Sequence, residues 1–114
     1  NGVKDIIEYI KKDHAIALMI DQRVSEGELV NLFNQPSLTT TLPAQLALKY
    51  NLKLVPVYIE RKKDNSFNLK FHSPIQSQKF KDKLELTKYL NKQLESMLIK
   101  NPGQWIWTHN KWKI

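Results

Sequence analysis

Two stretches of the chain repeat their apolar residues at the spacing of an amphipathic helix. The first covers residues 3–12 and ends in two lysines, which the helix dipole favours at a C-terminus. The second covers residues 81–100, and the Asn-Pro-Gly that follows is typical of a helix end. Between them, Thr41 and Pro43 are typical of a helix start, with the threonine as cap, and Asn51 is typical of a stop. We therefore predict three helices.

Shorter apolar or alternating runs predict the strands. Residues 15–20 are wholly apolar between polar neighbours, which favours a buried strand of a parallel sheet. Residues 52–59 give a second strand, in which Pro56 requires an edge, an end or a bulge. Residues 67–71 alternate and predict a two-faced antiparallel partner, while residues 29–33 form a minor strand. The predicted fold class is α/β: a right-handed βαβ unit, an antiparallel hairpin strand and a C-terminal helix.

Composition limits the classes of protein to consider. The chain has 114 residues and no Cys, which excludes a disulfide framework, a thiolate zinc site and a cysteine nucleophile. No run reaches the roughly 18 uncharged apolar residues of a membrane span. The chain begins at Asn1 and not at a Met, so we expect a piece of a longer protein. Its first helix and strand would then pack on upstream elements, and exposed apolar sheet surface is expected.

The net charge of +7 is unevenly distributed. Residues 1–57 carry six basic and six acidic residues, whereas residues 58–114 carry twelve basic and five acidic residues. The whole basic excess therefore lies in the second half. This pattern indicates that one end of the chain meets something anionic.

Two polar stretches are candidates for ligand binding. Asp21, Gln22 and Arg23 follow the predicted buried strand, and ligands of open parallel sheets bind beyond the carboxyl ends of strands. An acid, an amide and a guanidinium there could hold a polar, phosphorylated substrate, although a solvated loop with an ion pair explains the same residues. Thr39, Thr40 and Thr41 precede a helix N-terminus, where anions bind, although a single capping threonine accounts for them equally well.

The C-terminal stretch concentrates all three tryptophans in eight residues, interleaved with lysines. That mixture suits a membrane interface with anionic headgroups. It also suits stacking on single-stranded nucleic acid. A third interpretation is that the tryptophans pack on the core of the domain.

None of the three histidines has an obvious partner. A carboxylate five positions after a histidine would form an acid–base pair, but those positions hold Met19, Ser77 and Ile114. The histidines also lack the spacing of metal ligands. The sequence therefore predicts no catalytic dyad, no metal site and no cofactor in this chain.

Four ordered stretches together resemble the C-terminal half of the bacterial lipid A biosynthesis late acyltransferases, the lauroyl/myristoyl acyltransferase family. They read Ile-Asp-Gln (20–22), Leu-Phe-Asn-Gln-Pro-Ser-Leu-Thr (32–39), Leu-Val-Pro-Val-Tyr-Ile-Glu-Arg (54–61) and Asn-Pro-Gly-Gln-Trp-Ile-Trp-Thr-His-Asn-Lys-Trp-Lys (101–113). The first or the third stretch alone would be weak evidence for a family. All four in order, closed by Pro-x-Gln-Trp-x-Trp-x-His-x-x-x-Lys, are specific, and the resemblance spans nearly the whole chain.

The resemblance implies a partial glycerolipid-acyltransferase-like fold. It implies an O-acyltransferase that moves a fatty acyl chain from acyl carrier protein to a hydroxyl of a lipid A precursor, on the cytoplasmic face of the bacterial inner membrane. The family's general base belongs to a His-x4-Asp/Glu pair, which lies upstream of the region matched here, as does its membrane anchor. Residues 1–114 are therefore expected to be the C-terminal part of one acyltransferase domain and inactive alone.

The family's functional positions carry over residue by residue. Asp21 and Gln22 match the family's Asp-Gln, and the resemblance places them on the acceptor side of the pocket, as substrate binding or pocket structure. Thr39 matches the family's threonine, while Arg23 is added from its position after the predicted strand. We predict substrate binding for these four residues, Asp21, Gln22, Arg23 and Thr39. Asn34 stands where the family usually has Gly, and Asn also tolerates a left-handed backbone. The closing motif offers three further candidates for membrane or substrate contact, Trp107, His109 and Lys113. Lys62, Lys63 and the C-terminal lysines match no motif, and their charge alone suits an anionic membrane surface.

Two other interpretations stay open. One is a stand-alone basic module that binds nucleic acid or anionic lipid, based on the charge and the tryptophans. Such a nucleic-acid module needs a continuous basic face that carries aromatics, and no nucleic-acid motif is present, so we expect no nucleic-acid partner. The other is a degenerate acyltransferase-like protein that has lost its chemistry.

Overall fold

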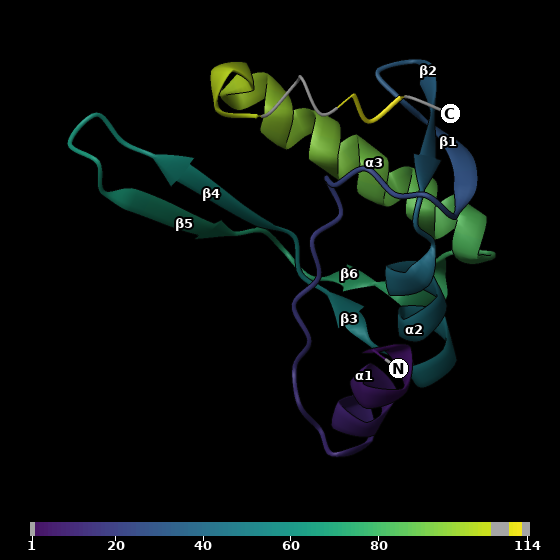
Figure 1. The fold of residues 1–114 in the computed structure, drawn as a ribbon. Helices are drawn as coiled ribbons and strands as arrows, with labels where there is room; N and C mark the ends of the chain where they lie inside the picture. The colour runs from purple at the N-terminus through teal and green to yellow at the C-terminus, as the bar shows by residue number, and fades with distance from the viewer. Residues whose placement is uncertain (1, 106–109, 113–114) are drawn as a thin grey trace.

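The computed structural model describes residues 2–105 and 110–112 of the chain (Figure 1). Its helices are α1 (Gly2–Lys11), α2 (Leu42–Tyr50) and α3 (Lys83–Lys100). Its strands are β1 (Glu28–Leu32), β2 (Gln35–Thr39), β3 (Lys53–Leu54), β4 (Val57–Arg61), β5 (Phe67–Phe71) and β6 (Ile75–Gln76). Two short 3-10 helices are η1 (Ser77–Lys79) and η2 (Pro102–Gln104). All three predicted helices are confirmed within a few residues at their ends.

The helix ends follow the expected chemistry with one exception. The Asp82 carboxylate accepts from the backbone N–H of Glu85 at 2.9 Å and so caps α3. Asn51 ends α2 in the left-handed conformation, with φ of 53°. Thr41 is the N-cap residue of α2, but its hydroxyl accepts from the Gln45 side chain at 2.7 Å and not from a backbone amide. The prediction that Thr41 caps the helix with its side chain was therefore wrong.

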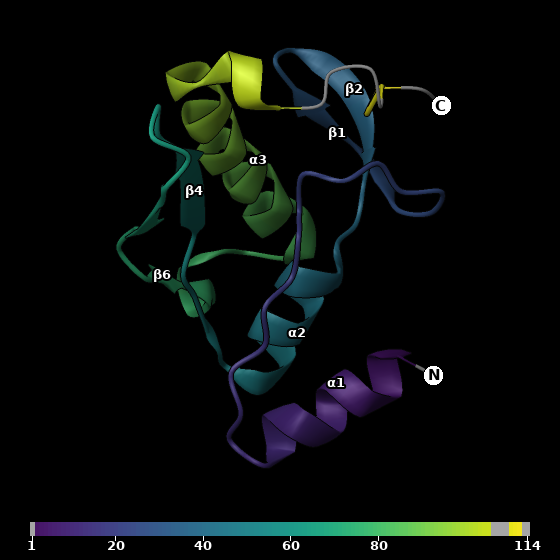
Figure 2. The same cartoon turned by 60° about the vertical axis from the view of Figure 1, so that its left-hand side comes forward.

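The strands pair only as three separate two-stranded antiparallel sheets in the described residues. The predicted strand over residues 52–59 is divided into β3 and β4 next to Pro56, as a residue without an N–H requires. The predicted partner over residues 67–71 is β5, and it pairs with β4. Helix α3 packs against β1 and α2, and η2 follows at its C-terminal end (Figure 2).

The expected βαβ unit does not form in the described part of the chain. Residues 14–20 lie outside every sheet, as an irregular segment between α1 and β1 (Figure 1). An apolar parallel strand needs a ladder partner and a cover on both faces, but here Leu18 and Met19 are 41% and 74% exposed. The strand prediction was wrong for this reason. The mixed α/β class, the hairpin strand and the C-terminal helix are confirmed, and they are compatible with a partial acyltransferase-like fold.

The hairpin of β1 and β2 lies inside the polar stretch for which only a minor strand is predicted. Phe33 and Asn34 connect the strands, with φ of 53° and 62°, and two left-handed residues match the twist of a tight hairpin. Asn34 therefore preserves the turn, as expected. The sequence does not reveal β2, because its Pro36 and polar residues are unusual for a strand. The proline is tolerated because β2 is an edge strand.

Helix α3 joins two hydrophobic clusters. The first consists of buried Ala44, Ala47, Ile75, Leu86 and Leu90. The second consists of buried Leu32, Leu94 and Leu98, with Trp105 and Trp112 packed against it. The predicted apolar stripe of α3 thus supplies both clusters. Ile20 packs against both, so the segment that leads to Asp21 is fixed between them.

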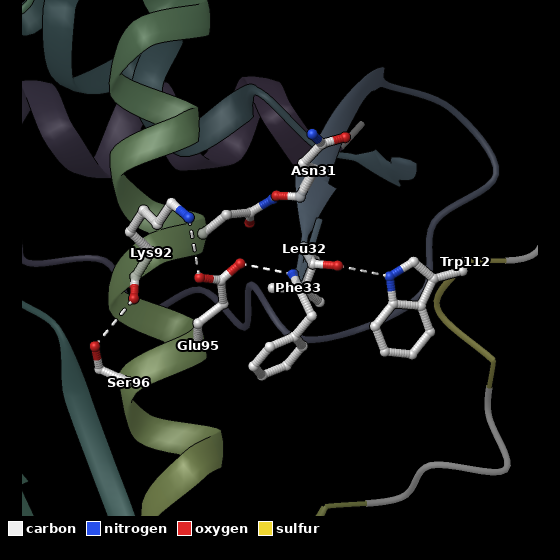
Figure 3. Close-up of polar contacts among 8 residues, drawn as sticks. Asn31, Leu32, Phe33, Lys92, Glu95, Ser96 and Trp112 are labelled. Atoms are coloured by element: carbon white, nitrogen blue, oxygen red, sulfur yellow. Dashed lines mark hydrogen bonds and ion pairs between the residues drawn. The ribbon is translucent and has the colours of Figure 1, made fainter. Parts of the chain in front are cut away.

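Polar side chains of α3 hold the end of β1 (Figure 3). The Glu95 carboxylate accepts from the backbone N–H of Phe33 at 2.6 Å, and the Asn91 amide donates to the carbonyl of Asn31 at 3.2 Å. These contacts satisfy backbone groups next to a tight turn, where strand pairing ends. They fix the hairpin of β1 and β2 to α3.

The hairpin of β4 and β5 projects from the rest of the molecule (Figure 1) and has an exposed apolar face. Its register pairs Val57 with Phe71 and Ile59 with Leu69, so these side chains share one face. The five apolar residues of that face are between 41% and 66% exposed: Val57, Ile59, Phe67, Leu69 and Phe71. This exposed face lies on a different hairpin from the first helix and strand for which exposed apolar sheet surface is expected, and residues 15–20 belong to no sheet.

Replacing Glu95 tests the contact between α3 and the β1 hairpin. Glu95→Ala should lower the free energy of unfolding by about 1–3 kcal/mol, because it removes the charged acceptor of a partly buried N–H. Lys92→Ala is the matched control, since it removes only the ion pair with Glu95, and the Lys92 side chain is 69% exposed. Its effect should stay below about 1 kcal/mol. Urea unfolding checks both, and equal effects of the two variants would contradict the assignment.

Candidate functional site

The Asp21–Gln22 turn is held by the C-terminal stretch of the chain. The Trp105 indole N–H donates to the Asp21 carboxylate at 3.2 Å, across 84 positions in the sequence. The Lys111 ammonium donates to the backbone carbonyl of Gln22 at 3.0 Å, across 89 positions. Two of the stretches that carry the family resemblance therefore meet at one place.

Lys111 is a buried cation at this meeting point. Its side chain and backbone together are only 3% exposed. Burial lowers the pKa of Lys111, because a charge loses hydration inside the protein, and the nearby Asp21 carboxylate acts in the opposite direction. Its own carbonyl accepts from the Ser37 hydroxyl at 2.9 Å, and Ser37 is fully buried in β2. The turn, the hairpin and the C-terminal stretch are thus tied together.

The same C-terminal stretch contacts the other two stretches of the resemblance. The Trp112 indole donates to the carbonyl of Leu32 at 3.0 Å (Figure 3). The Gln104 amide both accepts from and donates to the backbone of Arg61, at 3.1 and 3.0 Å, and so continues the edge of β4. Four residues of the closing stretch therefore hydrogen-bond to the three earlier stretches, which places the four motifs in one structural unit: Gln104, Trp105, Lys111 and Trp112.

The predicted substrate-binding residues differ in their surroundings. Asp21 is half-buried, and Gln22 and Arg23 are exposed. The Gln22 amide donates to the sulfur of Met19 at 3.2 Å, whereas the Arg23 side chain makes no hydrogen bond or ion pair within residues 2–105 and 110–112. Thr39 is 3% exposed, and its hydroxyl donates to the carbonyl of Ser37 at 2.8 Å. Substrate binding by these four residues stays a prediction.

The loop after Arg23 returns to Thr39 through a glycine. Gly27 has φ of +150°, and a Cβ at this position would overlap the carbonyl oxygen of Thr39 and lie 2.7 Å from its carbonyl carbon. Only a residue without a side chain permits this approach. Gly27 therefore joins the loop of residues 21–27 to the end of β2, next to Thr39.

The three proposed contact residues of the closing motif, Trp107, His109 and Lys113, lie outside the described residues. Trp105 and Trp112 are described, and their rings meet edge to face with centroids 5.9 Å apart. Both pack on the second hydrophobic cluster. For these two tryptophans the interpretation as core residues is confirmed, and they do not form a stacking platform for bases.

The described histidines do not assemble a catalytic pair. His14 is exposed and its ring meets that of Tyr9 at 5.4 Å, and Nε2 of His72 is buried without a hydrogen-bond partner. Over the described ranges no cluster of three His, Asp or Glu is placed to hold a metal ion. Within the same ranges, no helix combines the length and apolar character needed to cross a membrane.

Sequence reasoning missed Gln104 and Lys111 as parts of this site. Gln104 belongs to the closing motif, so its position in the motif could have marked it as important. Nothing in the sequence indicates its contact with Arg61. Lys111 is one of the C-terminal lysines whose charge suggested an anionic membrane surface, and for Lys111 that expectation was wrong, because the residue is buried and its ammonium donates to the Gln22 carbonyl. In sequence it is one lysine among twelve basic residues of the second half. Only the packing of the C-terminal stretch distinguishes it from the exposed lysines.

Comparison with known proteins identifies one family. A family model described as bacterial lipid A biosynthesis acyltransferase matches residues 1–114, the whole chain. No curated protein matches the chain. The family assignment and the four motifs therefore agree over the same residues.

The Gly27 contact gives a direct test of the loop that carries Asp21. Gly27→Ala should destabilise the protein by about 1–3 kcal/mol, because the new Cβ would overlap the Thr39 carbonyl and the backbone conformation is strained for Ala. The control is Gly103→Ala, where the added Cβ would have nothing within 4 Å. That control should stay within about 0.5 kcal/mol of the original protein. Thermal unfolding measures both, and a neutral Gly27→Ala would show that the loop does not lie against β2.

Proposed function

Because this chain belongs to the bacterial lipid A biosynthesis acyltransferase family, we propose that it is the C-terminal part of an enzyme that transfers a fatty acyl chain from acyl carrier protein to a hydroxyl of a lipid A precursor. Family membership by itself gives the acyltransferase activity and the lipid A pathway. The donor, the hydroxyl acceptor and the position of this chain in the enzyme are our proposal. The observation that carries it is the convergence of all four motifs through residues 101–112.

The proposed reaction needs a general base that this chain does not supply. The acceptor hydroxyl oxygen attacks the thioester carbonyl carbon, a C–O bond forms, and the C–S bond breaks. The base takes the hydroxyl proton and passes it to the departing thiolate. No histidine of the chain has a carboxylate five positions later. We therefore place the His-x4-Asp/Glu pair before Asn1, and the chain is inactive alone.

The Asp21–Gln22 turn is the proposed acceptor side of the pocket. The side chains of Gln22 and Arg23 are exposed and can contact a polar ligand, while the backbone of the turn is fixed from behind by Lys111. Asp21 is half-buried and already shares its carboxylate with Trp105. A carboxylate fixed in this way can accept a hydrogen bond from a sugar hydroxyl in one orientation. Thr39 supports the pocket from the end of β2.

The basic half of the chain is proposed to face the anionic surface of the inner membrane, on its cytoplasmic side. Lys62 and Lys63 are exposed at the tip of the hairpin of β4 and β5, beyond Arg61. The adjacent face of that hairpin exposes Phe67 and Phe71. A basic tip next to exposed aromatic residues suits an anionic lipid interface.

Replacing Asp21 tests the proposed site. In the full-length enzyme, Asp21→Ala should lower acyl transfer to the lipid A precursor by about 100-fold, the scale expected when a positioning contact is lost. Mass spectrometry of the acylated product measures the rate, and circular dichroism shows that the variant is folded. Asp5→Ala, in exposed α1, is the matched control and should retain full activity. Unchanged activity of Asp21→Ala would remove Asp21 from the site.

Vesicle binding tests the proposed membrane face. The double variant Lys62→Glu/Lys63→Glu should weaken binding to vesicles of phosphatidylcholine and phosphatidylglycerol by at least about 30-fold, since each lysine near an anionic surface contributes about 1 kcal/mol. Lys79→Glu/Lys81→Glu makes the same change of charge elsewhere and should have a smaller effect. Sedimentation with vesicles measures the binding. Equal loss in both double variants would show that net charge, and not the hairpin tip, determines the affinity.

A further inference from the structure

One lysine of the second half is placed unlike all the others. Of the lysines and arginines in residues 2–105 and 110–112, Lys111 is the only one that is buried, and every other one is exposed. Burying an ammonium is costly unless the protein replaces its lost hydration. Its position therefore needs a specific explanation, which attraction to an anionic surface does not provide.

The backbone around Lys111 is anchored on both strands of the β1–β2 hairpin. The Ser37 hydroxyl of β2 donates to the Lys111 carbonyl at 2.9 Å. The next residue, Trp112, donates from its indole to the Leu32 carbonyl of β1 at 3.0 Å. These contacts fix the backbone from which the Lys111 side chain extends, so they restrict the position of its ammonium.

That place is the back of the Asp21–Gln22 turn. The ammonium donates to the carbonyl of Gln22 at 3.0 Å, and it is close enough to the Asp21 carboxylate to interact with it electrostatically. The hydrogen bond to the carbonyl determines how the peptide after Gln22 is oriented.

We propose that Lys111 is a positioning residue for the acyl acceptor: it holds the Asp21–Gln22 turn in the conformation that receives the acceptor, and does not touch the acceptor itself. The inference rests on the proposed function, since it deepens the role of the same turn. Because Lys111 is buried, it does not contact a ligand directly. Its hydrogen bond to the Gln22 carbonyl lets it act indirectly, through the conformation of the turn. A neutral side chain of similar length fills the space but provides neither the charge nor the donor.

Steady-state kinetics of the full-length enzyme separate positioning from general stability. Lys111→Met should raise the KM for the lipid A precursor at least about tenfold, as expected for loss of a charged hydrogen bond, and leave the KM for the acyl donor unchanged. Lys111→Arg keeps the charge and should restore the acceptor KM to within about threefold. Lys100→Met, at the exposed end of α3, should leave both constants unchanged. If Lys111→Met does not fold, Lys111→Leu, which also lacks the charge and the donor, should show the same selective change.

A second measurement does not depend on activity. In a proton–nitrogen NMR spectrum of the full-length enzyme, the three tryptophans of this chain contribute three indole N–H signals, and Trp105→Phe assigns the one that reports the contact with Asp21. Lys111→Met should shift that signal, and Lys111→Arg should leave it close to its original position. A wild-type enzyme that does not acylate lipid A precursor would refute the proposed function, while the indole signal would still test Lys111. An unchanged Trp105 signal, or an unchanged acceptor KM, in Lys111→Met overturns the inference.

Discussion

The docking of α3 is the constraint on which the rest of the structure depends. One stripe of this helix supplies Leu86 and Leu90 to the first hydrophobic cluster and Leu94 and Leu98 to the second. Because a helix is rigid over its 18 residues, the two clusters keep a fixed separation, and Ile20 fills the space between them. The direction of α3 also returns the C-terminal stretch across the hairpin of β1 and β2. The contacts of the candidate site follow from that return.

The site is held mainly by polar groups that other parts of the chain satisfy. An indole on Asp21, an ammonium on the Gln22 carbonyl and a hydroxyl on the Lys111 carbonyl each join segments distant in sequence. A partly satisfied group of this kind is costly inside a protein, so removing one partner affects the others. The interactions therefore specify the conformation of the turn more than they add to stability. This is the arrangement expected where a loop has to present a side chain in one orientation.

The basic excess of the second half does not act as one surface. Lys62 and Lys63 are exposed at the tip of a hairpin whose apolar face is also exposed, whereas Lys111 is buried and serves the interior. Like Lys111, Trp105 and Trp112 serve the interior, since both pack on a hydrophobic cluster. The net charge of the chain thus combines residues of different physical roles, and only those at the surface can attract an anionic partner.

Local patterns in the sequence were enough to determine the helices, the break at Pro56, the left-handed positions of Asn34 and Asn51, and the family. The structural features depend on neighbours within a few residues: apolar spacing, a missing N–H, or a side chain that tolerates positive φ. The family depends on the order of four short motifs along the chain, which the sequence also records directly. The tertiary structure alone decided that residues 15–20 form no strand, since a strand requires a distant partner, and that Pro36 lies in one. It also decided which of many lysines is buried beneath Asp21. Pairing and burial depend on residues that are distant in sequence, and a local pattern does not record them.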